Sequence, residues 1–419
     1  MALKRGFKQT EVGALPDDWS VVSLGRLVRS VEYGSSAKSS SIGLVPVLRM
    51  GNLQGGKIDW SDLVYSNDHK EVSKYSLRAG DVLFNRTNTI DLVGKTSLYD
   101  GSIPAIFAGY LIRINVQAEF LDSRYLNLVL NTELARKHSA KVLSIAVGQA
   151  NINGQKLKTY PIPLPPTLAE QKAIAGALSD ADAWIESLEQ LIAKKRQIKQ
   201  GAMQELLTGK RRLPGFTIKW TIQLLGECGE VIMGQSPPGA TYNRSADGSP
   251  LINGPTEFTD RYPKKIQWTS APARFCKSGD LLICVRGSST GRTNFADDVY
   301  AIGRGVAAIR AKGSNSTDFM SYQIIAGVSE ILASATGSTF PSVDGASFRK
   351  LCIQLPHPDE QDAIALVLSD IEFEITELEL KLAKARQIKQ GMMQELLTGR
   401  IRLVKPTASA ERIQEAVNV

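Results

Sequence analysis

The chain has 419 residues, of which 43% are hydrophobic and 22% charged, and its formal net charge is +8. This length accommodates two or three domains, and the composition is that of an ordinary globular protein. No apolar run approaches the roughly 18 residues of a membrane-spanning helix, and the first residues lack the apolar segment of a secretory signal. These features argue against a membrane or secreted protein and predict a cytoplasmic one.

The cysteines and histidines form no recognisable ligand pattern. Cys228, Cys276, Cys284 and Cys352 match neither a zinc-binding spacing nor a disulfide framework, and the three histidines are scattered. The chain also lacks the GxxxxGK[ST] sequence of a phosphate-binding loop. We therefore expect reduced cysteines, no metal site, and no cofactor bound by this chain itself.

Residues 1–163 are predicted to form a first globular domain of mixed α/β fold. Short strand-like segments such as Gly109–Asn115 are separated by turns rich in glycine, asparagine and aspartate. With 20 basic and 14 acidic side chains, this segment carries most of the positive excess of the chain. A basic surface favours a polyanionic partner, although many proteins unrelated to nucleic acids are equally basic.

Residues 164–211 are predicted to form one long helix. Thr167-Leu-Ala-Glu170 has the form of a capping box, and Gly209 follows Leu-Leu-Thr where a left-handed C-terminal cap is expected. Apolar residues alternate at spacings of four and three, which is the heptad seam of a helix that pairs with another. The seam residues are Ile174, Leu178, Ile185, Leu188 and Ile192.

Two other faces of this helix carry a pattern. A second apolar line contains Ala177, Trp184, Leu191 and Ile198. It either packs on the globular domains or docks helices of another subunit, and the sequence leaves both open. A basic cluster at Lys194–Arg196 and Lys199 is interpreted as a solvated helix face, as is its counterpart at Lys384, Arg386 and Lys389 in the second half of the chain. Phosphate contacts or pairing with an acidic partner surface are the alternatives.

The second half of the chain repeats this order. Residues 212–355 are predicted to form a second mixed α/β domain, residues 356–403 a second long helix with Pro358 in its first turn, and residues 404–419 a C-terminal tail. Strand-like residues include Asp280–Val285. The seam of the second helix consists of Ile364, Leu368, Ile371, Ile375, Leu378 and Leu382.

The two helices are near-copies of each other. RQIKQGAMQELLTGKRRL at residues 196–213 returns as RQIKQGMMQELLTGRIRL at residues 386–403, with 15 of 18 positions identical. Glu170-Gln171 recurs as Glu360-Gln361 at the same offset of 190. A long helix with an apolar seam needs a partner, so we expect the copies to pair as an antiparallel coiled coil with pseudo-two-fold symmetry.

The globular segments correspond more loosely. Trp19 corresponds to Trp220, and Gly80-Asp-Val-Leu corresponds to Gly279-Asp-Leu-Leu. Residues with structural roles, such as these, recur at matching positions, whereas the polar residues that could form an active site do not. The pattern predicts two diverged binding domains on one conserved frame rather than two copies of an enzyme.

These features resemble the specificity subunit of type I restriction-modification systems. The resemblance is carried by the helix entrances PLPP…EQ and LPHPDEQ, by the twin RQIKQG-x-MQELLTG segments, and by the domain openings LPDDWSVVSLGRL and WTIQLLGECGEVIMGQSPPG. It covers nearly the whole chain, and the repeated order of domain and helix is typical of the family.

The resemblance implies a function in DNA recognition. Each globular segment would be a target recognition domain that reads one half of a bipartite sequence in double-stranded DNA. The helix pair would set the gap between the half-sites and dock two modification (methyltransferase) subunits, and two restriction subunits can join this assembly. The specificity subunit itself would have no catalytic residue, because S-adenosylmethionine, ATP and Mg²⁺ belong to the partner subunits.

Arginine, asparagine and glutamine on loops or strand ends are candidates for base contacts. In the first domain these are Arg49, Asn52, Arg86, Thr87, Asn88, Gln149, Asn151 and Asn153. In the second domain they are Asn243, Arg244, Asn253, Arg286, Ser288, Arg292 and Arg304. Lys264 and Lys265 are expected to contact phosphates. Arg86 and Arg286 are the strongest candidates because they follow the matched Gly-Asp pair at similar distances, although for each residue a fold-stabilising role is an equal alternative.

Two parts of the sequence match enzyme motifs only incompletely. Ser236-Pro-Pro-Gly239 lacks the acid or amide and the aromatic residue with which amino-methyltransferases hold a flipped base, so it is interpreted as a turn. Pro358-Asp359 and Glu379-Leu-Lys381 match a nuclease pattern only formally, because they lie along one predicted helix. The alternative function is a coiled-coil adaptor whose globular domains bind proteins instead of DNA.

Overall fold

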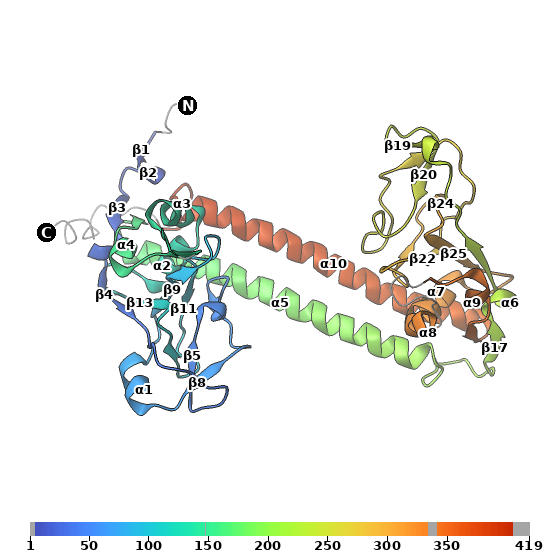
Figure 1. Cartoon of the computed structure of the whole chain (residues 1–419), viewed down its shortest axis with the longest axis horizontal. Coiled ribbons are helices and arrows are strands. Elements are labelled where there is room, and N and C mark those ends of the chain that lie inside the picture. The colour runs from blue at the N-terminus through green and yellow to red at the C-terminus, as the bar shows by residue number, and fades with distance from the viewer. Residues whose placement is uncertain (1–4, 147, 334–341, 405–419) are drawn as a thin grey trace. The chain divides into compact units, whose positions relative to one another are not determined.

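The computed structural model describes residues 5–146, 148–333 and 342–404, and the chain divides into two compact units (Figure 1). Unit 1 consists of Met1–Ser187 and Leu382–Val419, and unit 2 consists of Leu188–Lys381. The division falls within the long helices α5 (Leu168–Leu206) and α10 (Pro358–Leu396). Each unit therefore combines one globular domain with a segment of both helices, which the linear order of the sequence does not reveal.

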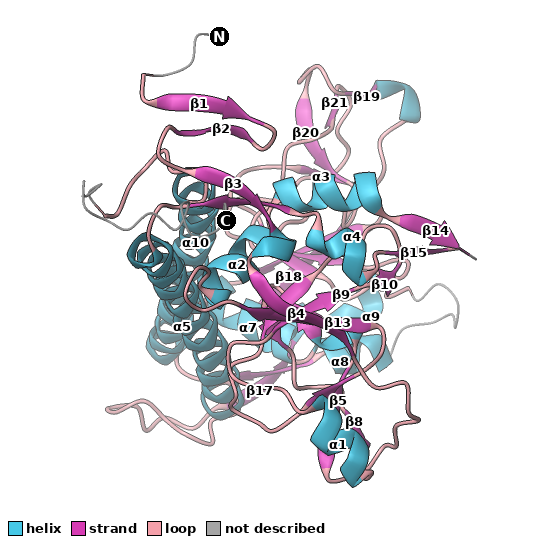
Figure 2. Cartoon of the chain, turned by 90° about the vertical axis from the view of Figure 1, so that its left-hand side faces the viewer, coloured by secondary structure: helices cyan, strands magenta, loops and turns pink. Residues whose placement is uncertain are grey.

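The globular domain of unit 1 is built on a four-stranded antiparallel sheet in the order β11-β9-β13-β4. These strands are β4 (Val28–Tyr33), β9 (Val82–Asn85), β11 (Thr96–Leu98) and β13 (Leu111–Val116). Of these strands, β4, β9 and β13 are labelled in Figure 2. Every residue of β9 is buried, which explains the nearly continuous apolar sequence of this strand. Beside this sheet lies a second sheet in the order β12-β5-β8, formed by β5 (Val45–Leu48), β8 (Val64–Ser66) and β12 (Ile106–Phe107).

Smaller elements complete unit 1. Three strands in the order β10-β15-β14 form a small antiparallel sheet, with β10 at Thr87–Asn88, β14 at Ser144–Ala146 and β15 at Gln149–Asn151. The paired strands are β1 (Phe7–Thr10) with β2 (Gly13–Pro16), β3 (Ser20–Ser23) with β16 (Pro161–Leu164), and β6 (Leu53–Gln54) with β7 (Lys57–Ile58). The short helices are η1 (Leu24–Arg26), η2 (Met50–Asn52), α1 (His69–Tyr75), α2 (Ser123–Leu130), α3 (Glu133–Val142) and α4 (Gly154–Lys158).

Unit 2 has the same central sheet. Its order β18-β25-β22-β23 corresponds strand by strand to β4-β13-β9-β11 of unit 1, and all its pairs are antiparallel. The strands are β18 (Gly229–Met233), β22 (Leu281–Cys284), β23 (Thr293–Phe295) and β25 (Val306–Ala311). The mixed α/β fold that the sequence predicts is confirmed, and the correspondence of the sheets explains the loose similarity of the two domains.

A second sheet and several helices surround this centre. The sheet has the order β19-β21-β20-β24, with β19 at Tyr242–Asn243, β20 at Ser249–Ile252, β21 at Trp268–Thr269 and β24 at Ala301–Ile302. β17 (Thr221–Leu224) pairs with β26 (Cys352–Leu355). The helices are α6 (Leu225–Cys228), η3 (Gly239–Thr241), α7 (Thr317–Ala326), α8 (Val328–Ala333) and α9 (Gly345–Arg349). No helix of the described residues has the length and apolar character needed to cross a membrane.

Both long helices have 39 residues and end as the sequence predicts. Gly209 and Gly399 have positive φ angles of 66° and 65°, the left-handed conformation of a C-terminal cap. A Cβ atom on Gly399 would also lie 2.6 Å from Cγ of Pro16, so this position requires glycine twice over. The predicted capping box is only half right, because Thr167 Oγ1 accepts the Glu170 N–H at 3.3 Å while the Glu170 carboxylate binds Arg402 instead.

Segments of α5 and α10 run antiparallel within each unit. In unit 1, Lys389 Nζ donates to Asp182 Oδ1 at 2.5 Å, and in unit 2 the equivalent Lys199 Nζ donates to Glu372 Oε1 at 2.5 Å. The seam residues are buried or half-buried. Those that are buried are Ile174, Leu178, Leu188, Ile192, Ile364, Leu368 and Ile375, and those that are half-buried are Ile185, Ile371, Leu378 and Leu382.

Candidate nucleic-acid interface

In unit 1, an arginine that follows α10 binds acidic residues of α5 and of the N-terminal part of the chain. This residue, Arg402, donates through Nε and Nη2 to Glu170 and through Nη1 and Nη2 to Asp18 at 2.9 and 3.0 Å. Its guanidinium also lies 6.0 Å from the ring of Trp19. The side chain of Glu170 is only 2% exposed, and burial raises the pKa of this carboxyl, an effect that the ion pair with Arg402 partly offsets.

The same junction exists in unit 2. Arg212, which follows α5, donates to both oxygens of Glu360 at 2.5 and 2.6 Å, and Trp220 Nε1 donates to the same carboxylate at 3.2 Å. The Glu360 carboxylate raises the pKa of Arg212. Arg212 and Glu360 lie 190 positions from Arg402 and Glu170, so the repeated sequence encodes the attachment of each domain to both helices.

The glutamine that follows each of these glutamates binds backbone of its own unit. Gln171 Oε1 accepts the Asp122 N–H at 2.9 Å, and its Nε2 donates to the Phe120 carbonyl at 3.0 Å. Gln361 Oε1 accepts the Ser316 N–H at 2.8 Å. Both glutamines are fully buried. The repeated Glu-Gln pair is therefore structural, a role that the sequence repeat indicates only by its position.

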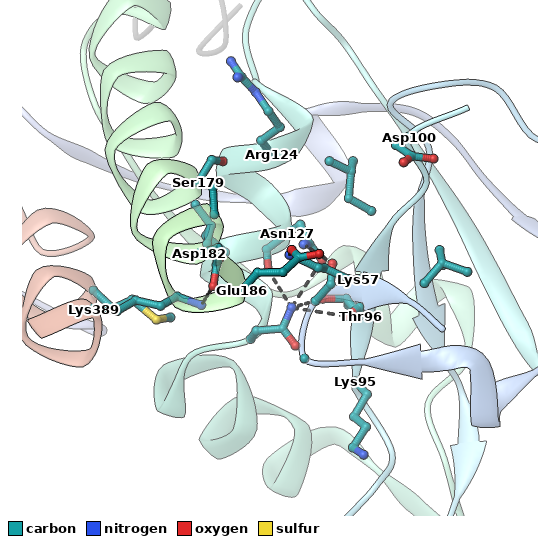
Figure 3. Close-up of a pocket in the computed structure, with 18 of the residues that line it drawn as sticks. Lys57, Lys95, Thr96, Asp100, Arg124, Asn127, Ser179, Asp182, Glu186 and Lys389 are labelled. Atoms are coloured by element: carbon teal, nitrogen blue, oxygen red, sulfur yellow. Dashed lines mark hydrogen bonds and ion pairs between the residues drawn. The ribbon is translucent and has the colours of Figure 1, made fainter. Parts of the chain in front are cut away.

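A cavity of about 730 Å³ lies in unit 1, where the β6–β7 hairpin and α2 meet the long helices. Figure 3 shows residues that line it. Both acidic residues of the cavity wall formed by α5 are paired: Asp182 with Lys389 of α10, and Glu186 with Lys57 of β7 at 2.9 Å (Figure 3). The lysines neutralise both carboxylates. In unit 2 the position equivalent to Asp182 is occupied by Glu372, which also accepts from Arg261 and Tyr322, so the two junctions differ in how their side chains are arranged.

Two of the residues predicted to contact DNA in unit 1 hold the fold together. Asn52 is 2% exposed, its Oδ1 accepts the Arg49 N–H, and its Nδ2 donates to the carbonyls of Asp59 and Asp62 at 2.9 Å. Arg49 Nη2 forms an ion pair with Asp62 at 2.9 Å. A buried, fully bonded amide cannot reach a base, so the prediction for Asn52 is wrong, and the Arg49 side chain is already paired with an acidic residue.

The structure brings the other predicted residues of unit 1 together around β10 and β15. Thr87 pairs with Asn151 in the small sheet, where Asn151 Nδ2 donates to Thr87 Oγ1 at 2.7 Å. Asn88 lies beside them and is half-exposed, and Gln149 is exposed. Asn153 caps α4 through its side chain, although it is exposed. This cluster, together with Arg86 after β9, forms the candidate interface of unit 1.

In unit 2 the predicted residues separate into two groups. Several have structural partners: Asn243 Nδ2 donates to the Asp247 carbonyl, Asn253 contacts Glu257 through its N–H, Arg292 donates to the carbonyls of Pro255 and Phe258, and Lys265 pairs with Asp298 at 2.7 Å. Arg292 and Lys265 are exposed despite these contacts. The side chains of the remaining residues are exposed and have no hydrogen bond or ion pair within the described residues, namely Arg244, Lys264, Arg286, Ser288 and Arg304. This second group is the candidate interface of unit 2.

The two strongest candidates are not equivalent. The Arg86 N–H donates to the Tyr110 carbonyl, and at the corresponding place in unit 2 the Val285 N–H donates to the Gly305 carbonyl. Arg286 therefore corresponds to Thr87, one residue further along the strand. Because successive side chains of a strand point to opposite faces, the two arginines lie on different faces of their domains. The matched spacing after Gly-Asp was misleading by one residue.

Some exposed apolar residues were not singled out by the sequence. Tyr33, Tyr110 and Ile145 of unit 1 are 46%, 54% and 62% exposed. On α10, three residues spaced seven apart, Leu366, Phe373 and Leu380, are 61%, 66% and 61% exposed. The three residues on α10 could have been found in the sequence as apolar residues at heptad spacing outside the seam. The exposure of the three residues of unit 1 depends on tertiary structure. On α5, Trp184, Leu191 and Ile198 are exposed, so the interpretation that this apolar line packs on the globular domains is wrong for these three residues. Ala177, the first residue of the line, does pack against the core of unit 1.

The interpretation of the basic cluster of α5 as a solvated face is wrong for Lys195, Arg196 and Lys199, whereas Lys194 is exposed. Lys195 donates to Glu374, Arg196 Nη2 donates to Glu379 at 2.6 Å, and Lys199 donates to Glu372 at 2.5 Å, all within unit 2. These acceptors lie on α10. The basic residues of one helix therefore stabilise its pairing with the acidic residues of the other.

Comparison with known proteins identifies the family. The model of the type I restriction modification DNA specificity domain matches residues 16–200 and 217–387, so each match includes one globular domain and most of the helix that follows. The chain belongs to this family. One relative, the putative type I restriction enzyme MjaX specificity subunit from Methanocaldococcus jannaschii, is 32% identical over 96% of this chain and 97% of the relative. The EcoKI specificity subunit of Escherichia coli is 28% identical over 50% of this chain and 45% of that subunit.

Solved structures show the same fold. The S subunit of a type I restriction-modification system from M. genitalium has a TM-score of 0.63, with 14% identity over 94% of this chain and 98% of that one. A chain from a study of complex assembly and conformational transition in a type I system has a TM-score of 0.59, with 23% identity over 92% of this chain and 99% of that one. The globular domain of unit 1 is hereafter called recognition domain 1, and that of unit 2 recognition domain 2.

Proposed function

We propose that this specificity subunit reads a bipartite DNA sequence, with one half-site for each recognition domain, and carries no catalytic centre of its own. The observation that carries this proposal is the duplication of one scaffold with different exposed polar residues. The central sheets and the Arg-Glu-Trp junctions are equivalent, whereas Thr87 stands where the other domain has Arg286. Two unlike reading surfaces on one scaffold suit two unlike half-sites, and the net charge of +8 favours a polyanion.

The helix pair is proposed to set the gap between the half-sites and to dock two modification subunits. These partner subunits, together with restriction subunits where present, would bind S-adenosylmethionine, ATP and Mg²⁺ and carry out methylation and cleavage. The alternative function, a coiled-coil adaptor that binds proteins instead of DNA, is not supported, because the family model describes a DNA specificity domain.

A pair of equivalent grooves supports docking of two copies of the same partner. In unit 1 a groove of about 400 Å³ is lined by Gln390, Met393, Gln394, Leu397 and Thr398 of the α10 region together with residues of α2 and α3. In unit 2 a groove of about 520 Å³ is lined by the five residues of the α5 region that lie 190 positions earlier, Gln200, Met203, Gln204, Leu207 and Thr208, and by residues of α7.

Packing does not account for the identity of the groove glutamines. Met393 and Leu397 pack against the core of unit 1, but Gln390 and Gln394 are exposed, and their side-chain amides have no hydrogen bond within the described residues. An exposed residue that is the same in both grooves fits a surface that meets the same partner twice. We propose that each groove receives one modification subunit.

The groove proposal predicts a stepwise loss of partner subunits. We expect Gln394→Arg and Gln204→Arg each to reduce the assembled complex by one modification subunit, and the double variant to bind none, because a long charged side chain would occupy the groove. Native mass spectrometry of the co-expressed complex measures the composition. Lys194→Glu, an exposed change on α5 outside the groove, serves as the control and should keep both subunits. Retention of two subunits by the double variant would refute this docking site.

The experiment that tests the proposed function is selection from random duplexes. The purified chain, alone and assembled with its modification subunits, is incubated with a pool of random DNA, and bound duplexes are sequenced. We expect enrichment of two short conserved blocks separated by a gap of fixed length and variable sequence. Enrichment of no sequence, even by the assembled complex, would exclude the proposed function.

A further inference from the structure

An arginine on the candidate interface of recognition domain 1 is held against an aromatic ring. The guanidinium carbon of Arg86 lies 4.7 Å from the centroid of the Tyr33 ring, and Nη1 donates to the Gly109 carbonyl at 3.4 Å. The buried Nε has no partner within the described residues. A guanidinium has five N–H donors, so most of the donors of Arg86 remain available while its position is defined.

The ring that supports Arg86 is itself fixed. The Tyr33 hydroxyl accepts the Gly154 N–H at 2.8 Å, at the first residue of α4. Tyr33 is the last residue of β4, where it pairs with Ile112 of β13, and it is 46% exposed. The backbone of Arg86 is also held on both sides, because its N–H donates to Tyr110 and its carbonyl accepts from Ile152. The arginine is thus preorganised before any ligand binds.

Guanine is the base that this arrangement suits. Its O6 and N7 atoms are two acceptors at one edge of the major groove, and an arginine whose plane is fixed can bind both. A phosphate would also attract an arginine and can be bound by two N–H groups at once, but such a contact carries no sequence information, so base selection distinguishes the two. The half-exposed side chains of Thr87 and Asn151 lie on the neighbouring strands, so polar groups for adjacent bases are at hand.

We propose that Arg86, positioned by Tyr33, reads a guanine in the half-site bound by recognition domain 1. This inference rests on the proposed function and deepens it by naming one base and one contact. Recognition domain 2 has no equivalent arginine–tyrosine pair, because Val285 occupies the position of Arg86 and Met233 occupies that of Tyr33. The guanine requirement from this contact therefore belongs to one half-site only.

The first test compares selected sequences. With the assembled complex, Arg86→Ala is expected to lose the preference for guanine at one position of one half-site, where discrimination falls by about 5- to 140-fold, the value of a bidentate arginine–guanine contact. All other positions and the whole second half-site should be unchanged. Arg29→Ala is the matched control, because Arg29 is an exposed arginine of the same strand as Tyr33 that pairs with Glu119. This control should keep every base preference.

A pair of tyrosine variants tests positioning by the ring. Tyr33→Phe keeps the ring and loses only its hydrogen bond with Gly154, so it should keep most of the guanine preference. Tyr33→Leu removes the ring and should lower the preference further, without changing the base selected elsewhere. A purely structural role for Tyr33 would instead weaken every position of the half-site together. Such a uniform loss would overturn the assignment of Tyr33 as the positioning residue.

A change in the DNA avoids any question of folding. Replacement of the selected guanine by 7-deazaguanine removes the N7 acceptor and should weaken binding of the unaltered complex by about 5-fold or more. The same replacement should leave binding by the Arg86→Ala complex unchanged. If both complexes respond equally, Arg86 does not contact this base, and the proposal is wrong.

The outcomes separate this inference from the proposed function. If the unaltered complex selects a bipartite sequence and Arg86→Ala selects the same one, the inference fails while the function stands. If Arg86→Ala weakens all sequences equally and reduces the salt dependence of binding, Arg86 contacts a phosphate, and the inference also fails. If the unaltered complex selects no sequence at all, the proposed function itself fails.

Discussion

Arg402→Ala is expected to lower the free energy of unfolding of unit 1 by roughly 2–4 kcal/mol, because it leaves the buried carboxylate of Glu170 without its partner. The value lies below that of a fully buried pair because the side chains of Arg402 and Asp18 are 20% and 33% exposed. The variant also removes the contact of the guanidinium with Trp19. Urea unfolding combined with hydrogen exchange measures the loss, with peptides from residues 16–27 reporting on unit 1.

One control variant and one equivalent variant accompany this prediction. Arg400→Ala removes the exposed ion pair between Arg400 and Glu395, which is worth little, so its stability should stay within about 0.5 kcal/mol of the unaltered chain. Arg212→Ala should cause a comparable loss in unit 2, where Glu360 is fully buried. If exchange in residues 16–27 is as slow in Arg402→Ala as in the unaltered chain, the junction contributes no stability.

The same variant should respond to pH in a defined direction. Burial raises the pKa of Glu170, and the ion pair with Arg402 lowers it, so loss of Arg402 should raise this pKa further. A carboxyl whose pKa is higher in the folded than in the unfolded state binds protons more readily when folded. Its contribution to stability is therefore lost as pH rises from the unfolded-state pKa through the folded-state pKa. Arg402→Ala should therefore be less destabilised, relative to the unaltered chain, at pH 4.5 than at pH 7.5.

Lengthening both helices is expected to abolish binding to the original target. Seven residues inserted after Gln190 and after the equivalent Leu380 keep the heptad seam and add about 10.5 Å of helix, close to the length of three base pairs. If the helices set the gap, one half-site then goes unread, and the affinity should fall by roughly 10²- to 10⁴-fold because the two contacts no longer reinforce each other. Selection from random duplexes should return the same two half-site sequences with a longer gap.

The design of the insertion supplies its own controls. The ion pairs Lys389–Asp182 and Lys199–Glu372 lie on opposite sides of the inserted segments and remain in register when both helices are lengthened. An insertion in α5 alone breaks this register and should prevent stable pairing, which circular dichroism and thermal unfolding detect. A doubly lengthened chain that still prefers the original gap would show that the helices do not set it.

The sequence predicted the long helices well because their signals are local and repeated. Heptad spacing, the glycines at 209 and 399, and the copied segment all depend on neighbouring residues along the chain, and the structure has helices at Leu168–Leu206 and Pro358–Leu396. The mixed fold of the domains followed from the same kind of pattern. The order of their strands did not, because β4 pairs with β13 across about 80 residues and no local signal specifies such a pairing.

The candidate interface was predicted less accurately, for physical reasons that particular residues show. Asn52 has the residue type of a base reader, but its amide is consumed by three backbone groups, which only the tertiary structure reveals. Arg86 and Arg286 differ by one position of register, and a one-residue shift reverses the face of a strand. The supporting ring of Tyr33 lies more than 50 residues from Arg86 in sequence, so no spacing rule could have found it.

The composition of unit 1 has a consequence for the order of events during synthesis. Unit 2 is one continuous stretch, Leu188–Lys381, whereas unit 1 needs Leu396, Leu397 and Arg402 from the far end of the chain to close its core. At the usual rate of translation, the ribosome needs roughly 10–40 s to travel from residue 187 to residue 402. The core of unit 1 therefore cannot be completed until all of unit 2 has been synthesised, so unit 2 can fold first although it lies later in the sequence than the N-terminal domain.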